Sequence, residues 1–344
     1  MQKLREIFKR WLPPIIWFYF TLLLGWLVAY FLVGDRQGYL ALVNVFAKYL
    51  FFPVVFIALL NLVIRRREIW GMVLLALAAF LFFWGNLFVP SINNFPADAP
   101  RLRVMTFNTL VISPDPQASL DVIQRVDPDV IFIQEINPRL ARLLQEQMAD
   151  TYPYQLLDPQ DDVTGIGLLS KYPFRPSGQR LPEGWAGEPQ LVIMDWAGQE
   201  IGLLNFHMWA SNPTFAYVIE KKFRIREEQA QVINDLATKS TYPLIVGGDA
   251  NVTSLNTAHA IMMRNLHDVW TEAGFGFGHT FPGGEADYSF VPNAPPWLTP
   301  EWFIRIDYIL VSDDWGVQAA YLAPYDGASD HRGVVAELVF LGER

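Results

Sequence analysis

The 344-residue chain contains no cysteine. This absence excludes disulfide bonds, zinc sites built from thiolates and cysteine nucleophiles. It does not identify a compartment, although it permits an oxidising one without mispaired thiols. The sequence also has no internal repeat and no low-complexity tract.

Basic residues are scarce in the C-terminal part of the chain. Residues 1–100 contain nine Lys and Arg against four Asp and Glu, which leaves 17 basic and 31 acidic residues, a net charge of −14, for residues 101–344. Nonspecific nucleic-acid binding relies on many Lys and Arg contacts to phosphates, so this charge disfavours it. A net charge hides local patches, however, and one basic run is present, at residues 221–226.

Long apolar runs, by contrast, are abundant before residue 90. They cover about 12–33, 40–64 and 69–89, and each is near the roughly 20 residues that a helix needs to cross a bilayer. A cleaved signal peptide would explain only the first run. We therefore expect a membrane anchor with three transmembrane helices at residues 1–89, a Pro- and Asn-rich linker at 90–100 and a globular domain at 101–344.

The short flanks of the runs indicate an orientation. Basic residues precede the first run, and three arginines at 65–67 separate the second from the third. The positive-inside rule then places the N-terminus in the cytoplasm and, after three spans, the globular domain outside it. Lys48, near the end of its run, is expected to snorkel to the lipid headgroups.

The pattern after residue 101 is that of a layered domain. Short apolar runs predict strands, and helical spacing separates some of them. The expected strands are 102–107, 130–134, 165–170, 190–195, 201–206, 244–246, 305–311 and 333–340, and the expected helices are 117–126, 138–148 and 220–237. This order favours an α+β domain with two sheets in its core.

Polar residues follow several of these strands where each strand ends. Singly, each has an ordinary explanation, because Asp and Asn commonly form turns or helix caps after strands. A sheet gathers strand ends along one edge, however, so we expect these residues to meet in one pocket. They are Asn108, Glu135, His207, Asp249, Asn251, Asp307, Asp330 and His331.

The order and setting of these residues resemble the endonuclease/exonuclease/phosphatase superfamily, which includes DNase I-like nucleases, inositol-polyphosphate phosphatases and neutral sphingomyelinases. The resemblance covers residues 101–341 and implies a four-layer αββα sandwich with the active site at the top of the two sheets. It rests on Thr106-Phe107-Asn108, Gln134-Glu135, Asn205-Phe206-His207, Gly248-Asp249-Ala250-Asn251, Arg305-Ile306-Asp307-Tyr308-Ile309 and Ser329-Asp330-His331, with Arg226 and Gln229 on the helix after His207.

The resemblance also implies roles in metal-assisted phosphate ester hydrolysis. Glu135 is the expected ligand of Mg²⁺ or Mn²⁺, with Asn108 and Asp330 in or next to its shell, because hard cations take oxygen ligands. The family pattern assigns activation of water to Asp249 and Asn251, and contact with the phosphate or leaving group to His207. Asp307 is expected to fix His331, and within the superfamily this pair is sometimes the base instead.

The substrate stays open at this point. A membrane-tethered phosphoesterase acting on lipid headgroups or other envelope-side esters is favoured over a tethered nuclease acting on DNA or RNA, and a non-catalytic scaffold is third. Two aromatic segments, 208–217 and 288–303, flank expected site residues. Such segments can insert into a bilayer interface, stack on bases or pack on the protein itself.

Overall fold

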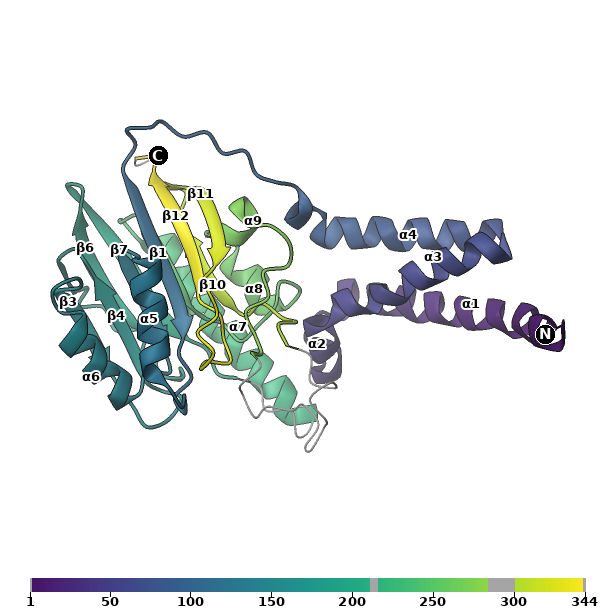
Figure 1. Ribbon diagram of the computed structural model, residues 1–344, viewed down its shortest axis with the longest axis horizontal. Coiled ribbons are helices and arrows are strands. Elements are labelled where there is room, and N and C mark those ends of the chain that lie inside the picture. The colour runs from purple at the N-terminus through teal and green to yellow at the C-terminus, as the bar shows by residue number, and fades with distance from the viewer. Residues whose placement is uncertain (1, 211–215, 284–300, 343–344) are drawn as a thin grey trace.

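The computed structural model describes residues 2–210, 216–283 and 301–342. A globular domain of two sheets carries a set of long helices that project from one side of it (Figure 1). The aromatic segments 208–217 and 288–303 therefore fall partly outside the described residues.

The first sheet has the strand order β11-β12-β1-β2-β4-β3. Its central strands β1 and β2 are parallel, and the other pairs are antiparallel. The parallel pair is connected by helix α5, as a parallel connection requires a crossover. The bounds are β1 Arg101–Asn108, β2 Val130–Gln134, β3 Tyr154–Asp158, β4 Ile166–Ser170, β11 Trp315–Leu322, β12 Val334–Phe340 and α5 Pro116–Val126.

The second sheet repeats this plan with the order β5-β6-β7-β8-β10-β9. Here β7 and β8 form the central parallel pair, and helix α7 connects them. The bounds are β5 Phe174–Pro176, β6 Gln190–Trp196, β7 Gln199–His207, β8 Leu244–Asp249, β9 His267–Asp268, β10 Asp307–Val311 and α7 Ala216–Lys239.

The sheets pack face to face, and helices cover their outer faces. Val104, Phe132, Leu203 and Ile245 belong to the core between the sheets. Helices α5 and α6 (Pro138–Gln147) share a core with the first sheet, whereas α7 and α8 (Thr257–Met262) share one with the second. The domain is thus the expected four-layer αββα sandwich.

The sequence pattern missed four strands, of which β11 is the longest. We expected 305–311 and 333–340 to be the last two strands, but β11 lies between them and pairs with β12. Its sequence WGVQAAYL lacks a clear alternation, and a register shift between Val317 and Ala319 breaks its period of two. The others, β3, β5 and β9, are short strands at the edges of the sheets.

Three stretches in the N-terminal part are long and apolar enough to cross a membrane: Trp11–Val33, Ala47–Ile64 and Arg67–Phe88. The second of these candidate spans begins at Ala47, whereas we expected the apolar run to enter the membrane from about residue 40. Helix α2 (Gly38–Val45) is a separate element, and its Ala41 packs against Phe223 of α7. The remaining elements are α1 Gln2–Val33, η1 Ala47–Phe51, α3 Phe52–Ile64, α4 Arg67–Trp84, η2 Gly85–Phe88 and α9 Val269–Ala273.

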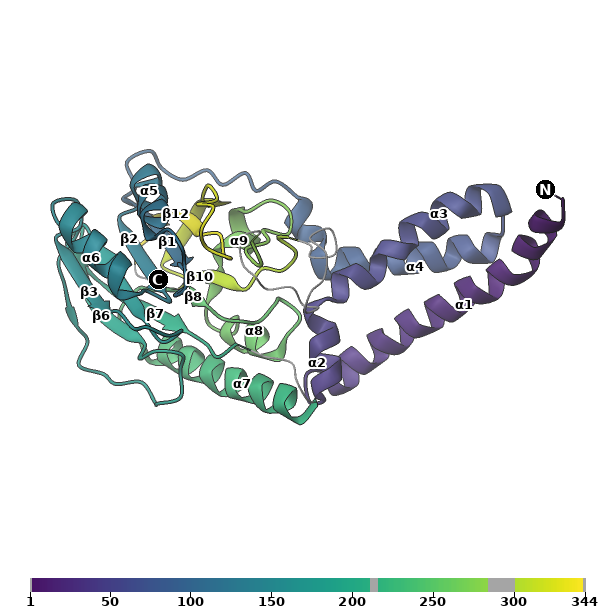
Figure 2. The same ribbon diagram turned by 60° about the horizontal axis from the view of Figure 1, so that its bottom comes forward.

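The N-terminal helices contact the globular domain at several places. Figures 1 and 2 show α1, α3 and α4 projecting from the domain together, with α2 lying between them and α7. Phe277 packs against Trp84 and Phe88, and Lys48 lies with its Nζ 4.9 Å from the centroid of the Phe277 ring. Residues 90–100 contain no helix or strand, but they run along β11, where Asn93 Nδ2 donates to the Val317 carbonyl at 2.7 Å.

Candidate active site

Strand register brings the polar residues to one edge of the sandwich. In the first sheet, Asn108 at the end of β1 lies beside Gln134, which directly precedes Glu135. In the second, Asp249 at the end of β8 is flanked by His207 of β7 and Asp307 of β10. Pairing alone therefore sets three of the expected site residues side by side.

Two glycines allow β8 to reach this place. A Cβ at Gly247 would lie 2.1 Å from the ring of Phe132 in the opposite sheet, and one at Gly248 would lie 2.0 Å from the carbonyl oxygen of Phe206. Neither position has room for a side chain. Close approach of backbone to its neighbours thus explains the Gly-Gly pair before Asp249.

A polar network between the two sheets was not anticipated. Gln134 Nε2 donates to Asn205 Oδ1 at 2.8 Å, and Asn205 Nδ2 donates to the Gly167 carbonyl at 2.7 Å. Thr106 Oγ1 donates to Gln134 Oε1 at 3.3 Å. These groups are buried and bonded, so they fix the sheets relative to one another directly beneath the site. Gln134 directly precedes Glu135, and Asn205 lies two residues before His207. This proximity to expected site residues is the sequence signal that could have indicated the network.

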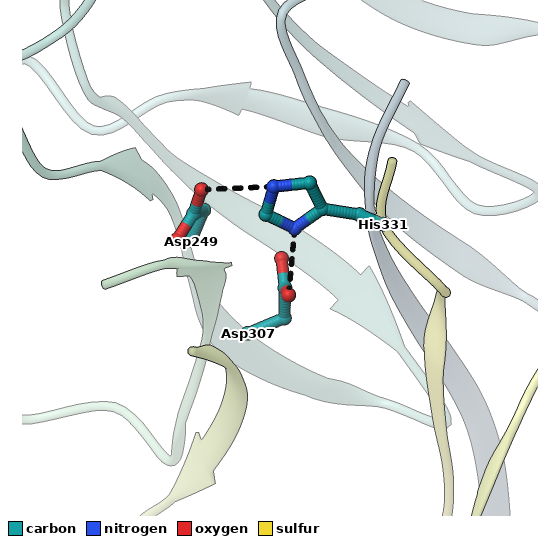
Figure 3. Close-up of side chains that lie close together, drawn as sticks. All are labelled: Asp249, Asp307 and His331. Carbon is teal, nitrogen blue, oxygen red and sulfur yellow. Dashed lines mark hydrogen bonds and ion pairs between the residues drawn. The ribbon is translucent and has the colours of Figure 1, made fainter. Parts of the chain in front are cut away.

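His331 lies between two carboxylates (Figure 3). Its Nδ1 is 2.9 Å from Asp307 Oδ2, and its Nε2 is 3.8 Å from Asp249 Oδ2. Burial alone would lower the pKa of His331, but the charges of Asp307 and Asp249 outweigh it and raise the pKa to about 10. The ring is therefore held as a cation at neutral pH.

Asp249 is the most interconnected carboxylate of the site. Its Oδ1 accepts from the Asn251 backbone N–H at 2.9 Å, and its Oδ2 accepts from Asn108 Nδ2 at 3.1 Å and lies 3.6 Å from His207 Nε2. Burial, and then the charge of Asp307, raise the pKa of Asp249 above its ordinary range. A buried carboxyl group with a raised pKa is suited to accept a proton near neutral pH.

His207 is held from its other face by a loop. Its Nδ1 lies 3.2 Å from the Val163 carbonyl oxygen, and Asn251 Nδ2 lies 3.4 Å from its Nε2. Burial lowers the pKa of His207. The pKa values of the two histidines are thus shifted in opposite directions, and His207 is the one that favours the neutral form.

Glu135 and Asp330 form a second acidic pair beside Asn108. Glu135 Oε1 accepts from Asn108 Nδ2 at 3.1 Å, and its Oε2 accepts from the Val111 backbone N–H at 3.2 Å. Burial raises the pKa of Asp330, and the negative charge of Glu135 raises it further. Two carboxylates that repel each other suit a hard divalent cation, and Asn108 orients Glu135 through its amide nitrogen.

One more group in the site could also hold a metal ion. Asp249, Asp307 and His331 each offer a ligand atom, and these atoms lie within 4.8 Å of one another. Their hydrogen bond, however, already engages His331 Nδ1 with Asp307. Within the described part of the chain, Asp307 Oδ1 has no hydrogen-bond partner, so one buried oxygen is left for a ligand or water.

Residues outside the expected set position these groups. Thr280 Oγ1 accepts from the backbone N–H groups of Ile306 and Asp307 at 3.1 and 3.4 Å. Ser329 Oγ donates to the Asn108 carbonyl at 2.7 Å and accepts from the His331 N–H at 3.0 Å. Thr280 lies in a segment without a recognisable pattern, so sequence gave no signal for it.

The loops around His207 also border a cavity of about 540 Å³. The loop after β3 contributes Thr164, next to Val163, and residues 180–189 form the other wall. The Ala186 N–H donates to the His207 carbonyl at 3.0 Å, which ties that wall to the end of β7. The cavity therefore lies next to the loops that hold His207, although none of the expected site residues lines it.

Several solved structures have the same fold at TM-scores above 0.5, among them the following three. TDP2 from D. rerio, in complex with a single-strand DNA product, has a TM-score of 0.53 at 16% identity, covering 69% of this chain and 98% of that one. Truncated TDP2 from Caenorhabditis elegans has a TM-score of 0.52 at 16% identity, covering 70% and 98%. A functionally unknown conserved protein from Enterococcus faecalis has a TM-score of 0.51 at 18% identity, covering 70% and 100%.

No curated protein is significantly similar to the chain in sequence. The endonuclease/exonuclease/phosphatase family, whose members are metal-dependent phosphoesterases and nucleases, matches residues 105–331. This match spans the site from β1 to His331 and covers most of the globular domain. The chain belongs to the endonuclease/exonuclease/phosphatase family.

Proposed function

We propose that the protein is a membrane-anchored, Mg²⁺-dependent phosphoesterase that hydrolyses a phosphate ester at the bilayer surface, with a lipid headgroup as the favoured substrate. One observation carries this proposal: Phe281, which packs on His331, is hydrogen-bonded to Phe303, which contacts the start of the second candidate span. The site is therefore built against the anchor and is not held away from it on a free tether.

The contacts run through two phenylalanines. The ring of Phe281 lies 4.8 Å from the His331 ring, centroid to centroid, and the Phe303 N–H donates to the Phe281 carbonyl at 3.1 Å. Phe303 in turn packs on Phe46, and its carbonyl accepts from the Tyr49 hydroxyl at 2.7 Å. Tyr49 lies in the first turn of the second candidate span. Tyr49 of the candidate span and His331 of the site are thus connected through only two residues, Phe303 and Phe281.

The site residues suit water attack on phosphorus. Asp249 would accept the proton of the attacking water, which Asn251 orients. His331, kept cationic by Asp307, would stabilise the negative charge that develops on the phosphoryl oxygens. His207 contacts the phosphate or the leaving oxygen.

Glu135, Asp330 and Asn108 would hold the metal ion. When bound, Mg²⁺ supplies neutralisation of phosphate oxygen charge and stabilisation of the leaving alkoxide. Mn²⁺ prefers the same oxygen ligands and is the expected substitute.

A tethered nuclease is the second candidate, because the D. rerio TDP2 structure contains a single-strand DNA product. The basic run at 221–226 gives it little support. Arg226 is buried, Arg224 pairs with Glu220, and Lys222 lies over the Trp209 ring at 4.8 Å. The run therefore does not present a continuous basic track to a nucleic-acid backbone.

We also propose that the catalytic domain is extracytoplasmic. Arg65 and Arg66 lie between α3 and α4, and Arg67 begins α4, at the end of the anchor away from the domain. A cytoplasmic location of this loop is what the positive-inside rule favours. Reporter fusions at the C-terminus should be active outside the cytoplasm, and a cytoplasmic signal would overturn this orientation.

The test uses the full chain in lipid nanodiscs. Phosphatidylglycerol, sphingomyelin, phosphoinositides, plasmid DNA and RNA should be offered in parallel with Mg²⁺, with Glu135→Gln and His331→Ala as site variants and Glu146→Gln, on the exposed face of α6, as the matched surface control. We expect hydrolysis of a lipid ester that both site variants lose and the control keeps. Cleavage of nucleic acid alone would replace the lipid proposal, and inactivity on every ester would favour the scaffold reading.

A further inference from the structure

The loop after the first membrane helix contains a buried carboxylate. Asp35 is only 2% exposed, although it lies in the short turn between α1 and α2. Its Oδ1 accepts from Asn44 Nδ2 of α2 at 2.8 Å, and its Oδ2 accepts from Asn256 Nδ2 at 3.2 Å and from the Thr257 backbone N–H at 2.7 Å. One side chain of the anchor thus joins α2 to the catalytic domain.

Both catalytic-domain donors belong to the segment that follows Asn251. Asn256 Oδ1 accepts from the Thr253 N–H at 2.8 Å and from Thr253 Oγ1 at 3.1 Å, so Asn256 folds the loop back on itself. Its amide nitrogen is left to bond outward, and Asp35 is the side chain that accepts from it. Asn256 and Thr257 are therefore bonded to a residue more than 200 positions earlier in the chain, and Asn256 Nδ2 also donates to the Ala41 carbonyl of α2 at 3.3 Å.

Asn251 itself has a backbone that needs such support. Its φ of +52° lies in the left-handed region, which Asn adopts more readily than other non-glycine residues but which still costs free energy that the surroundings must offset. In this conformation Asn251 Nδ2 reaches the Met208 carbonyl at 3.0 Å and faces His207. A loosened loop would let Asn251 leave this position.

Arg226 adds an electrostatic connection between the anchor and the site. It is 1% exposed, and its Nη1 donates to the Trp209 carbonyl at 3.3 Å. Among the described residues, its Nε and Nη2 have no hydrogen-bond partner. The two carboxylates that offset its burial are Asp35 and Asp249, one from the anchor and one from the site.

We infer that Asp35 is a positioning residue of the active site: through Asn256 and Thr257 it holds the loop that carries Asn251. The membrane anchor is then a part of the catalytic scaffold, and the first interhelical loop completes the site from outside the family domain. If Asp35 had a purely structural role and only docked α2 against α7, its replacement would loosen α2 and α7 and would leave the loop at residues 250–257 unchanged.

The kinetic test rests on the proposed phosphoesterase activity. The full chain in nanodiscs is assayed with Mg²⁺ on bis(p-nitrophenyl) phosphate for Asp35→Ala, Asp35→Asn and, as the matched control, Asp98→Ala in the exposed part of the linker. Misplacement of a catalytic group costs up to about 100-fold in rate, so we expect kcat of Asp35→Ala to fall about 10- to 100-fold with KM changed less than about threefold. Asp35→Asn keeps an acceptor for Thr257 and Asn256 and should stay within about threefold of wild type, by the same principle.

Hydrogen exchange tests the inference without requiring any enzymatic activity. In Asp35→Ala, the amides of residues 250–257 should exchange faster, whereas those of β1 should not change. Faster exchange confined to α2 and α7, or a wild-type kcat in Asp35→Ala, would overturn the inference. If Asp35→Ala does not fold, the Asp35→Asn variant provides the test, because its side chain can still accept from the Thr257 N–H. A loss in kcat of more than tenfold in Asp35→Asn, with unchanged exchange at residues 250–257, would also overturn the inference.

Discussion

Replacing Arg305 with methionine should destabilise the protein strongly, although Arg305 never contacts the expected reaction centre. Its guanidinium bonds Asp268 at two points, Nη1 to Oδ1 at 3.1 Å and Nη2 to Oδ2 at 2.5 Å, and both residues are buried. Arg305→Met leaves the Asp268 carboxylate buried without this partner, and breaking such a pair costs about 3–5 kcal/mol. For a domain of this size, that corresponds to a decrease in Tm of roughly 6–20 °C.

The pH dependence of this loss follows from the pKa of Asp268. Burial alone would raise the pKa of Asp268, but Arg305 lowers it below its ordinary value, so the pair stabilises wild type at neutral pH and loses this contribution only as the solution becomes strongly acidic. Without Arg305, burial raises the pKa of Asp268, and the folded variant takes up a proton as pH falls. The Tm deficit should therefore be larger at pH 7.5 than at pH 5.

Differential scanning fluorimetry of the full chain in detergent measures both effects. Arg101→Met is the control, because Arg101 is exposed and bonds only the exposed side of β11 through Gln318. The double variant Asp268→Leu/Arg305→Met should recover most of the stability, since removing both partners leaves no buried charge. A double variant no more stable than Arg305→Met, or a deficit independent of pH, would refute the reasoning.

Three further predictions concern the site. Asp307→Asn removes the first charge that raises the pKa of His331, so the alkaline limb of the kcat–pH profile should move to lower pH by about 1–3 units, and an unmoved limb would contradict the proposed pairing. Asn108→Ala releases Glu135, so the Mg²⁺ concentration for half-maximal activity should rise about 10- to 100-fold; an unchanged metal titration would show that Asn108 does not orient the ligand. Gly247→Ala places a Cβ 2.1 Å from a ring of the opposite sheet and should lower the free energy of unfolding by about 1–3 kcal/mol, whereas wild-type stability in chemical denaturation would mean that the sheets can separate freely.

Much of the domain could be predicted because its strands are buried runs that end at polar residues. β2, with every residue buried, is followed by Glu135, and β8 ends in Gly-Gly-Asp. A short run that is apolar throughout indicates a strand that is covered on both faces. The resemblance then supplied the order of the layers, which periodicity alone does not determine.

What escaped prediction depends on contacts between distant segments. The run at 40–64 is apolar almost throughout, so composition could not show that α2 leaves the span to pack on α7. Asp35 reads as an ordinary loop charge beside Arg36, and only the fold reveals its bonds to Asn256 and Thr257. Thr280 positions Asp307 through backbone groups that no sequence pattern marks.

The matching strand orders of the two sheets give the site an internal symmetry. Each sheet has a central parallel pair joined through a helix, β1-α5-β2 in one and β7-α7-β8 in the other. Asn108 and His207 then occupy equivalent ends of the first strands, and Glu135 and Asp249 follow or end the second strands. The two acids thus come from corresponding places in two half-domains with no detectable sequence repeat. The half-domain with Glu135 would neutralise charge through the metal ion, and the half-domain with Asp249 would accept the proton of the attacking water.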